Sequence, residues 1–121
     1  MTDQKTMLIV DDSRVSRILI RKFAGDANSG WCFLEAENGD DALTKARGRD
    51  IDLMTLDFHM PGMNGLELGA LLREQFPHAH MTLLTANVQR SILEKASNVG
   101  MSVMHKPITQ DKIRNYLAQS T

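Results

Sequence analysis

Short runs of apolar residues alternate along the chain with longer stretches in which apolar positions recur every three or four residues. The short runs are typical of buried strands, and the longer stretches are typical of helices that pack on one side. Five such pairs follow one another, which predicts five strand–helix units. The expected strands are Thr6–Val10, Trp31–Ala36, Ile51–Leu56, Met81–Leu84 and Ser102–Met104.

Each of the longer stretches has polar residues or helix-breaking residues where a helix should begin or end. Ser13 and Thr109 are suitable N-caps, and Gly48 and Pro77 suit the ends of two other helices. The expected helices are Ser13–Phe23, Gly39–Arg47, a third from Asn64 or Gly65 to about Gln75, Val88–Asn98, and a last one that carries Ile113, Tyr116 and Leu117.

The first expected helix has a clear apolar side. Val15, Ile18, Leu19 and Phe23 share one helical face, and the arginines lie mostly on other faces. We therefore expect these four side chains to face the core.

Regular alternation of strand and helix predicts a parallel sheet with helices on both faces, in which ligands bind at the carboxyl ends of the strands. Polar residues stand at four of these ends. Asp11 and Asp12 follow the first strand, Asp57 follows the third, Thr85 follows the fourth and Lys106 follows the fifth. We expect these side chains to lie together at one edge of the sheet, with Glu35-Ala36-Glu37 at its rim.

This set of side chains predicts a particular chemistry. Clustered carboxylates repel one another unless a cation is present, and oxygen ligands with open positions suit Mg²⁺. A lysine and a hydroxyl nearby could bind the oxygens of a phosphoryl group, and a carboxylate can accept that group. Each of these residues alone would be an ordinary turn or cap residue, so the prediction rests on their joint occurrence.

Length, composition and charge limit the classes of protein. The 121 residues suit one domain, expected to span 1–121 with its core at about 6–117. Fourteen basic and fifteen acidic residues give no electrostatic reason to expect nucleic acid or a membrane surface as partner. No apolar stretch approaches the roughly 20 residues of a membrane helix, and one cysteine, Cys32, allows no disulfide within the chain. We expect a soluble, cytoplasmic protein.

Four segments give the chain a resemblance to the receiver domains of two-component response regulators. They are LIVDDS (Leu8–Ser13), LDFHMPGMNG (Leu56–Gly65), LLTA (Leu83–Ala86) and HKPI (His105–Ile108). The resemblance covers about residues 6–117. It implies an α/β, flavodoxin-like, doubly wound sheet of five parallel strands in the order 2-1-3-4-5, with five helices.

The resemblance also implies a role for each acid. Asp57 matches the phosphoacceptor. Asp12 and Asp57 match the side-chain ligands of Mg²⁺ (or Mn²⁺), the backbone carbonyl of His59 matches a third ligand, and Asp11 matches an acid that holds the metal through water. The side chain of His59 is expected to be exposed, although this position and Asn87 vary among receivers and tune the phosphoryl lifetime.

Two further residues match the family's active site, and one departs from its pattern. Thr85 matches the hydroxyl that moves to the phosphoryl group, and Lys106 matches the lysine that pairs with it. Pro107 matches a proline that is often preceded by a cis bond. Receivers usually carry Tyr or Phe three residues before the lysine, where this chain has Val103. A valine has no ring to turn inward, so we expect backbone and helix shifts to carry any signal.

The resemblance implies a phosphorylation-dependent switch, of the stand-alone chemotaxis type or from a related two-component pathway. A histidine kinase or phosphotransfer protein would donate the phosphoryl group. A protein partner would read the result at the fourth helix, fifth strand and fifth helix. Apart from hydrolysis of its own aspartyl-phosphate, no enzymatic activity is expected, and the chain is expected to be a monomer.

Three alternatives remain at this stage. The chain could be a receiver from a larger regulator. It could be a Mg²⁺-dependent phosphatase or phosphotransferase of the haloacid dehalogenase type, but adjacent Asp11 and Asp12 do not fit the Asp-x-Asp spacing of those enzymes. A flavin module would require a glycine- and hydroxyl-rich loop after the first strand. A metal site at His78 and His80 is not expected, because no acidic partner is evident.

Overall fold

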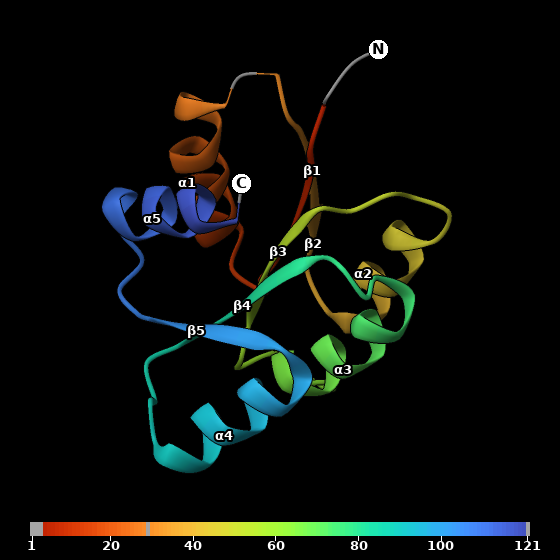
Figure 1. The fold of residues 1–121 in the computed structure, drawn as a ribbon, viewed down its shortest axis with the longest axis vertical. Coiled ribbons are helices and arrows are strands. Elements are labelled where there is room, and N and C mark those ends of the chain that lie inside the picture. Colours follow the sequence, from red (N-terminus) through yellow and green to blue (C-terminus); the bar gives the residue numbers. More distant parts are fainter. Residues whose placement is uncertain (1–3, 29, 121) are drawn as a thin grey trace.

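The computed structural model describes residues 4–28 and 30–120 and contains one sheet of five parallel strands (Figure 1). The strand order β2-β1-β3-β4-β5 confirms the predicted fold. Neighbouring strands start nearly level with one another, as in the pairing of Thr6 with Cys32 and of Leu53 with His80. The strands are β1 (Thr6–Val10), β2 (Cys32–Ala36), β3 (Leu53–Asp57), β4 (His80–Thr85) and β5 (Met101–His105).

Five helices cover the two faces of the sheet. Helices α1 and α5 lie on one face, and α2, α3 and α4 lie on the other (Figure 1). This arrangement buries the sheet on both sides, which explains the nearly continuous apolar runs of its strands. The helices are α1 (Arg14–Ala27), α2 (Gly39–Ala46), α3 (Gly65–Gln75), α4 (Arg90–Val99) and α5 (Gln110–Gln119).

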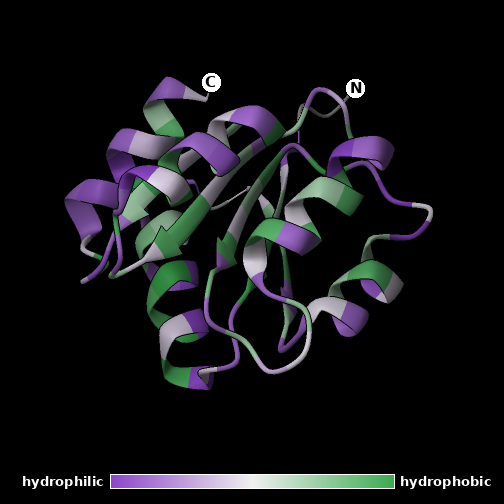
Figure 2. Ribbon diagram, turned by 90° about the horizontal axis from the view of Figure 1, so that it is seen from below, coloured by the Kyte–Doolittle hydropathy of each residue, from purple (hydrophilic) through white to green (hydrophobic). Residues whose placement is uncertain are grey.

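Two hydrophobic cores lie on opposite sides of the sheet. Side chains alternate along each strand, so Ile9 packs beneath α1 and α5 while Val10 packs beneath the other three helices. Figure 2 shows that the helices carry both hydrophobic and hydrophilic residues, as is typical of helices that pack on one side. The only tyrosine of the chain, Tyr116, lies in the core beneath α5, and its hydroxyl is within hydrogen-bond distance of the carbonyls of Met54 (3.0 Å) and His80 (2.7 Å).

Side-chain caps fix where several helices begin. The hydroxyls of Ser13 and Thr109 accept backbone N–H bonds at the starts of α1 and α5, as the sequence predicts. At the start of α3, Asn64 and Glu67 form a reciprocal capping box. Helix α4 lacks a side-chain cap at its start, but it ends at Gly100, which adopts a left-handed conformation (φ 79°).

The face that α1 turns toward the sheet differs from the sequence prediction. Of the four residues predicted to face the core, Phe23 does pack against it. Val15, Ile18 and Leu19 are 67%, 51% and 43% exposed, whereas Ile20 and Ala24 are buried. The contact stripe of α1 is centred on these two residues, four positions apart. The helix has apolar residues on more than one face, so periodicity alone could not identify the buried side.

Arg73 connects the ends of α3 and α4. Its guanidinium donates hydrogen bonds of 2.7–3.2 Å to five backbone carbonyls. Such a fork can satisfy several carbonyls at once because its five N–H groups lie in one plane. The accepting residues are Phe76, Pro77, Ala79, Val99 and Gly100.

Among the described residues, no helix has the length and apolar character needed to cross a membrane.

Candidate functional site

The predicted polar residues do meet at the carboxyl ends of the strands. Asp57 is the last residue of β3, and Thr85 is the last residue of β4. The backbone N–H of Phe58 donates to the carbonyl of Leu84 (2.9 Å), and that of Lys106 donates to the carbonyl of Thr85 (3.0 Å). These bonds join the chain just beyond β3 and β5 to the end of β4.

Three carboxylates form the centre of the site. One oxygen of each of Asp11, Asp12 and Asp57 lies within 4.8 Å of the others, and this is the only such group of three potential metal ligands among residues 4–28 and 30–120. Asp11 and Asp57 are each 2% exposed, and Asp12 is exposed to solvent. The site therefore has two buried acids and one acid that is exposed to solvent.

Lys106 provides the positive charge at the buried side of this cluster. Its Nζ donates to Asp57 Oδ1 at 2.7 Å, and its side chain is 34% exposed, against 3% for Asp57. The peptide bond between Lys106 and Pro107 is cis, which agrees with the sequence-based expectation. The Nζ of Lys112 donates to the carbonyls of His105 and Pro107 and so supports the loop on both sides of Lys106.

Burial is the main influence on the acidity of the two enclosed carboxyls. It raises the pKa of Asp57, and the hydrogen bond and charge of Lys106 oppose that rise. Burial also raises the pKa of Asp11 from 3.8 to about 6, and the N–H of Ser13, which donates to Asp11 at 2.8 Å, opposes the rise. Repulsion among the acids raises both values further.

This donor set fits a divalent cation of the Mg²⁺ type. All three groups are hard oxygen ligands, and a cation among them would relieve the repulsion that adds to the raised pKa values of Asp11 and Asp57. The exposed position of Asp12 is compatible with the waters that Mg²⁺ retains. The His59 side chain is exposed, as expected, and its ring contacts Phe58 edge-on at 4.8 Å between centroids. The metal role of the His59 carbonyl stays a prediction.

Thr85 lies at the site, but its hydroxyl is engaged with the following loop. The residue is fully buried, and Oγ1 accepts the N–H of Asn87 (3.0 Å) and donates to its carbonyl (3.2 Å). A hydroxyl has one proton, so it can donate to a phosphoryl oxygen only after it releases the Asn87 carbonyl. Sequence reasoning placed Thr85 correctly and missed this partner.

Gly65 allows α3 to begin directly against Asp57. A Cβ atom at position 65 would lie 2.5 Å from the Asp57 carbonyl oxygen and 2.8 Å from a methyl carbon of Leu83. The N–H of Gly65 also donates to the carbonyl of Phe58 at 3.2 Å. The backbone at the start of α3 therefore lies directly against the backbone at the end of β3.

Val103 occupies the place where the sequence departs from the family pattern. It pairs with Leu83 across β4 and β5, and its side chain is partly buried against the core beneath α2, α3 and α4. β5 (MSVMH) therefore has neither a tyrosine nor a phenylalanine that could change places between core and surface.

Sequence reasoning also missed a group of charged residues beside the acids. The Nη1 of Arg17 donates to the backbone carbonyl of Asp11 at 2.6 Å, and its Nε donates to Glu35 at 3.3 Å. Arg21 donates to the second oxygen of Glu35 at 3.0 Å. Glu35 was assigned to the rim, and only the three- to four-residue spacing of the arginines could have suggested their shared partner.

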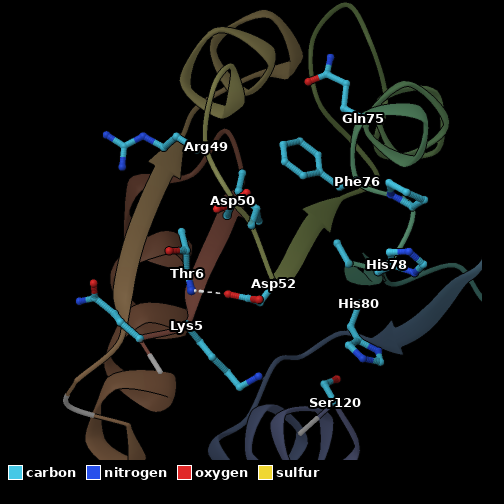
Figure 3. A pocket seen from close by; sticks show the side chains of 14 residues that line it. Lys5, Thr6, Arg49, Asp50, Asp52, Gln75, Phe76, His78, His80 and Ser120 are labelled. Atoms are coloured by element: carbon cyan, nitrogen blue, oxygen red, sulfur yellow. Dashed lines mark hydrogen bonds between the residues drawn. The ribbon is translucent and has the colours of Figure 1, made fainter. Parts of the chain in front are cut away.

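Two hollows lie at opposite ends of the sheet. One of about 430 Å³ adjoins the acid cluster and is lined in part by Asp12, Glu37 and Asp40. A larger one of about 860 Å³ lies at the amino ends of the strands, where Figure 3 shows His78 and His80 on one side of the opening. Parallel sheets bind ligands at the carboxyl ends of their strands, so we place the site at the smaller hollow.

The chain is similar to proteins of a known family. A family model described as the response regulator receiver domain matches residues 7–118. The sensor protein EvgS of Escherichia coli K12 is 34% identical over 120 residues, which cover 98% of this chain and 10% of that protein. The chain thus spans about a tenth of the length of that relative.

Solved structures show the same likeness. The chemotaxis protein CheY4 of Vibrio cholerae has a TM-score of 0.89 and 26% identity, with 98% of this chain and 99% of that chain covered. A response regulator from Burkholderia pseudomallei, solved with a phosphorylated aspartic acid, a calcium ion and citrate, has a TM-score of 0.83 and 27% identity, with 94% and 66% covered.

Proposed function

The chain belongs to the response regulator receiver family of two-component signalling, and from this premise we propose that it is a phosphorylation-dependent switch with Asp57 as its phosphoryl acceptor. The observation that carries the proposal is the 2.7 Å contact between Lys106 Nζ and Asp57 Oδ1, beside two further acids. The Burkholderia relative, which holds a phosphorylated aspartic acid, supports it.

The proposed donor is a phosphohistidine on a histidine kinase or phosphotransfer protein. A carboxylate oxygen of Asp57 forms a bond to phosphorus while the bond from phosphorus to the donor nitrogen breaks. The imidazole keeps the electron pair and then takes up a proton. Lys106 holds the Asp57 carboxylate in place and offsets the charge on the transferred oxygens. Water later attacks the phosphorus, the bond from phosphorus to the Asp57 oxygen breaks, and phosphate is released. The chain therefore acts on no separate substrate.

Mg²⁺ or Mn²⁺ is the proposed cofactor. Asp12, Asp57 and the backbone carbonyl of His59 are the proposed direct ligands, and Asp11 is the proposed acceptor for a metal-bound water. When bound, the cation supplies positive charge beside the phosphoryl oxygens. Asp11 contributes a buried oxygen whose orientation is fixed by the Ser13 N–H.

Thr85 is the proposed link between phosphorylation and the surface. Its hydroxyl would leave the Asn87 carbonyl and donate to a phosphoryl oxygen, which releases the loop before α4. Val103 cannot supply an aromatic rearrangement, so the expected readout is a shift of this loop and of α4. Beryllofluoride, a phosphoryl mimic, should therefore shift amide NMR signals from Thr85 into α4, and unmoved signals with the mimic bound would contradict this route.

The proposed reader is a protein that binds the surface formed by α4, β5 and α5. The likeness to the Vibrio cholerae chemotaxis protein supports chemotaxis as the pathway, and the likeness to sensor proteins supports a related two-component pathway. We propose that the chain acts as a monomeric cytoplasmic module. A pull-down with mimic-bound and free protein would identify the reader by its preference for one form.

Intact mass spectrometry tests the phosphorylation site. Phosphoramidate with Mg²⁺ should add the mass of one phosphoryl group to the wild type and none to Asp57→Asn. Asp50→Asn is the matched control, because Asp50 is exposed and lies beside the larger hollow at the opposite end of the sheet. Equal modification of Asp57→Asn and the wild type would refute the assignment.

A further inference from the structure

Arg17 is the most enclosed arginine of α1 and points back toward the acid cluster. Its side chain is 14% exposed, compared with 53% for Arg21 one turn later, and Arg14 is also exposed. The guanidinium donates to the carbonyl oxygen of Asp11 at 2.6 Å, a charge-assisted bond at the short end of the usual range. An arginine is thus held against the backbone of the loop that carries Asp11 and Asp12.

The carbonyl that Arg17 binds belongs to the peptide group between Asp11 and Asp12. The orientation of this group is shared by both residues, because it fixes ψ of the first and φ of the second. The other polar groups of Asp11 are also held: its N–H donates to the carbonyl of Ala36 (3.1 Å), and its carboxylate accepts the N–H of Ser13 (2.8 Å). Arg17 completes the set of contacts that determines how the two carboxylates point.

Glu35 holds the guanidinium in turn. Its carboxylate accepts from both Arg17 and Arg21, and its backbone carbonyl accepts from Lys45 at 2.6 Å. Glu35 offsets the charge of Arg17 only in part, because it also pairs with Arg21. The guanidinium contacts the site through the carbonyl of Asp11, so its main effect there is geometric. Outer-shell groups of this kind orient metal ligands without touching the metal.

We propose that Arg17, oriented by Glu35, is a positioning residue for Mg²⁺ binding, because it fixes the peptide between the two acids that follow β1. The inference rests on the proposed function, in which those acids and Asp57 hold the cation. It predicts that loss of Arg17 weakens Mg²⁺ binding while Asp57 and Lys106 remain able to take up a phosphoryl group.

Arg17→Met and Arg21→Met form a matched pair. Each variant loses one bond to Glu35, and only Arg17→Met also loses the bond to Asp11. Calorimetry should show a Mg²⁺ dissociation constant raised about tenfold or more for Arg17→Met, the usual effect of an outer-shell change, and little changed for Arg21→Met. Urea unfolding of both variants measures the purely structural cost. Equal Mg²⁺ affinities in the two variants would overturn the inference.

Phosphorylation by phosphoramidate separates this inference from the proposed function. In Arg17→Met, the Mg²⁺ concentration for half-maximal phosphorylation should rise by the same factor as the dissociation constant, and the maximal rate should stay near that of the wild type. If the wild type itself takes up no phosphoryl group, the proposed function fails. If it does, and Arg17→Met has the same Mg²⁺ dependence, only the role of Arg17 fails.

A measurement on the unaltered protein covers the case in which Arg17→Met does not fold. In a Mg²⁺ titration followed by ¹⁵N NMR, the side-chain Nε–H signal of Arg17 should shift with the same dissociation constant as the backbone amide of Asp12. The Nε–H signal of Arg21 should not follow it. An Arg17 signal that is unmoved at saturating Mg²⁺ would refute the proposal.

Discussion

Lys106 and Asp57 are 49 positions apart in the chain, yet the ammonium of one lies 2.7 Å from the carboxylate of the other. They come from the ends of β5 and β3, which are separated in the sheet by β4. The contact thus depends on the correct assembly of three strands. It also joins a nearly buried acid to a cation that remains one-third exposed.

Replacement of Lys106 by methionine should raise the pKa of Asp57 further. The lysine lowers this pKa through its hydrogen bond and charge, and the variant leaves burial unopposed. A carboxyl-carbon NMR titration of metal-free protein would measure the change, and urea unfolding should show a loss of roughly 1–3 kcal/mol at neutral pH. Lys95→Met is the control, because Lys95 is an exposed lysine of α4. An unchanged Asp57 titration would contradict the assigned pairing.

The stability of metal-free protein should depend on the ionisation of Asp11. Its pKa is raised from 3.8 to about 6 in the folded state, so the folded protein binds this proton more tightly than the unfolded chain. The contribution of Asp11 is therefore present below about pH 4 and is lost as the pH rises to about 6. The shift corresponds to about 3 kcal/mol at most.

The variant Asp11→Asn isolates this effect, because an amide cannot ionise and still offers an oxygen to Ser13. Without metal, it should be more stable than the wild type at pH 7 by about 1–3 kcal/mol, and the difference should vanish toward pH 4. Urea unfolding at several pH values measures it. A constant difference from pH 4 to pH 7 would exclude Asp11 as the titrating group.

Gly65→Ala should destabilise the fold by roughly 2–4 kcal/mol, because the added methyl group would lie against the Asp57 carbonyl and a methyl carbon of Leu83. Thermal or urea unfolding provides the measurement. Gly30→Ala is the matched substitution, since a Cβ there meets no atom within 4 Å. Comparable losses in the two variants would show that close approach at position 65 is not the cause.

Helix α4 should open more readily at its start than at its end. Its start has no side-chain cap, and its end is held by Arg73 through the carbonyls of Val99 and Gly100. Hydrogen exchange should be faster in the first turn, and Arg73→Met should accelerate exchange in the last turn by roughly tenfold. Arg114→Met, on the exposed side of α5, serves as control. Equal exchange at both ends of wild-type α4 would contradict this asymmetry.

The strands, and the meeting of the acids with Lys106 at one edge of the sheet, could be predicted because each leaves a local signal. A buried strand is an apolar run such as Thr6–Val10, whose limits are as predicted, and parallel topology then brings Asp12, Asp57 and Lys106 to one edge. Element ends were less certain: β3 runs to Asp57 itself, and α1 continues to Ala27. Ends depend on ladder bonds and caps that apolar patterns do not encode.

The partners of the site residues could not be predicted from the sequence. The hydroxyl of Thr85 binds the backbone of Asn87, and Arg17 binds the backbone of Asp11. A threonine or an arginine can form hydrogen bonds with many different groups, so the residue type alone does not identify the partner. The buried face of α1 was predicted incorrectly because Ile18 and Leu19 have the same apolar character as Ile20. Such choices are decided by tertiary packing.

Tyr116 gives the protein an optical reporter. Burial raises the pKa of its phenol, and the hydroxyl is bound to carbonyls of β3 and β4. Tyrosinate absorbance in alkaline solution will therefore record the separation of α5 from the sheet. The single tryptophan, Trp31, is half-buried next to β2, which is an edge strand of the sheet. Two ultraviolet signals, one from the tyrosine and one from the tryptophan, can thus follow the middle and one edge of the same sheet without any added label.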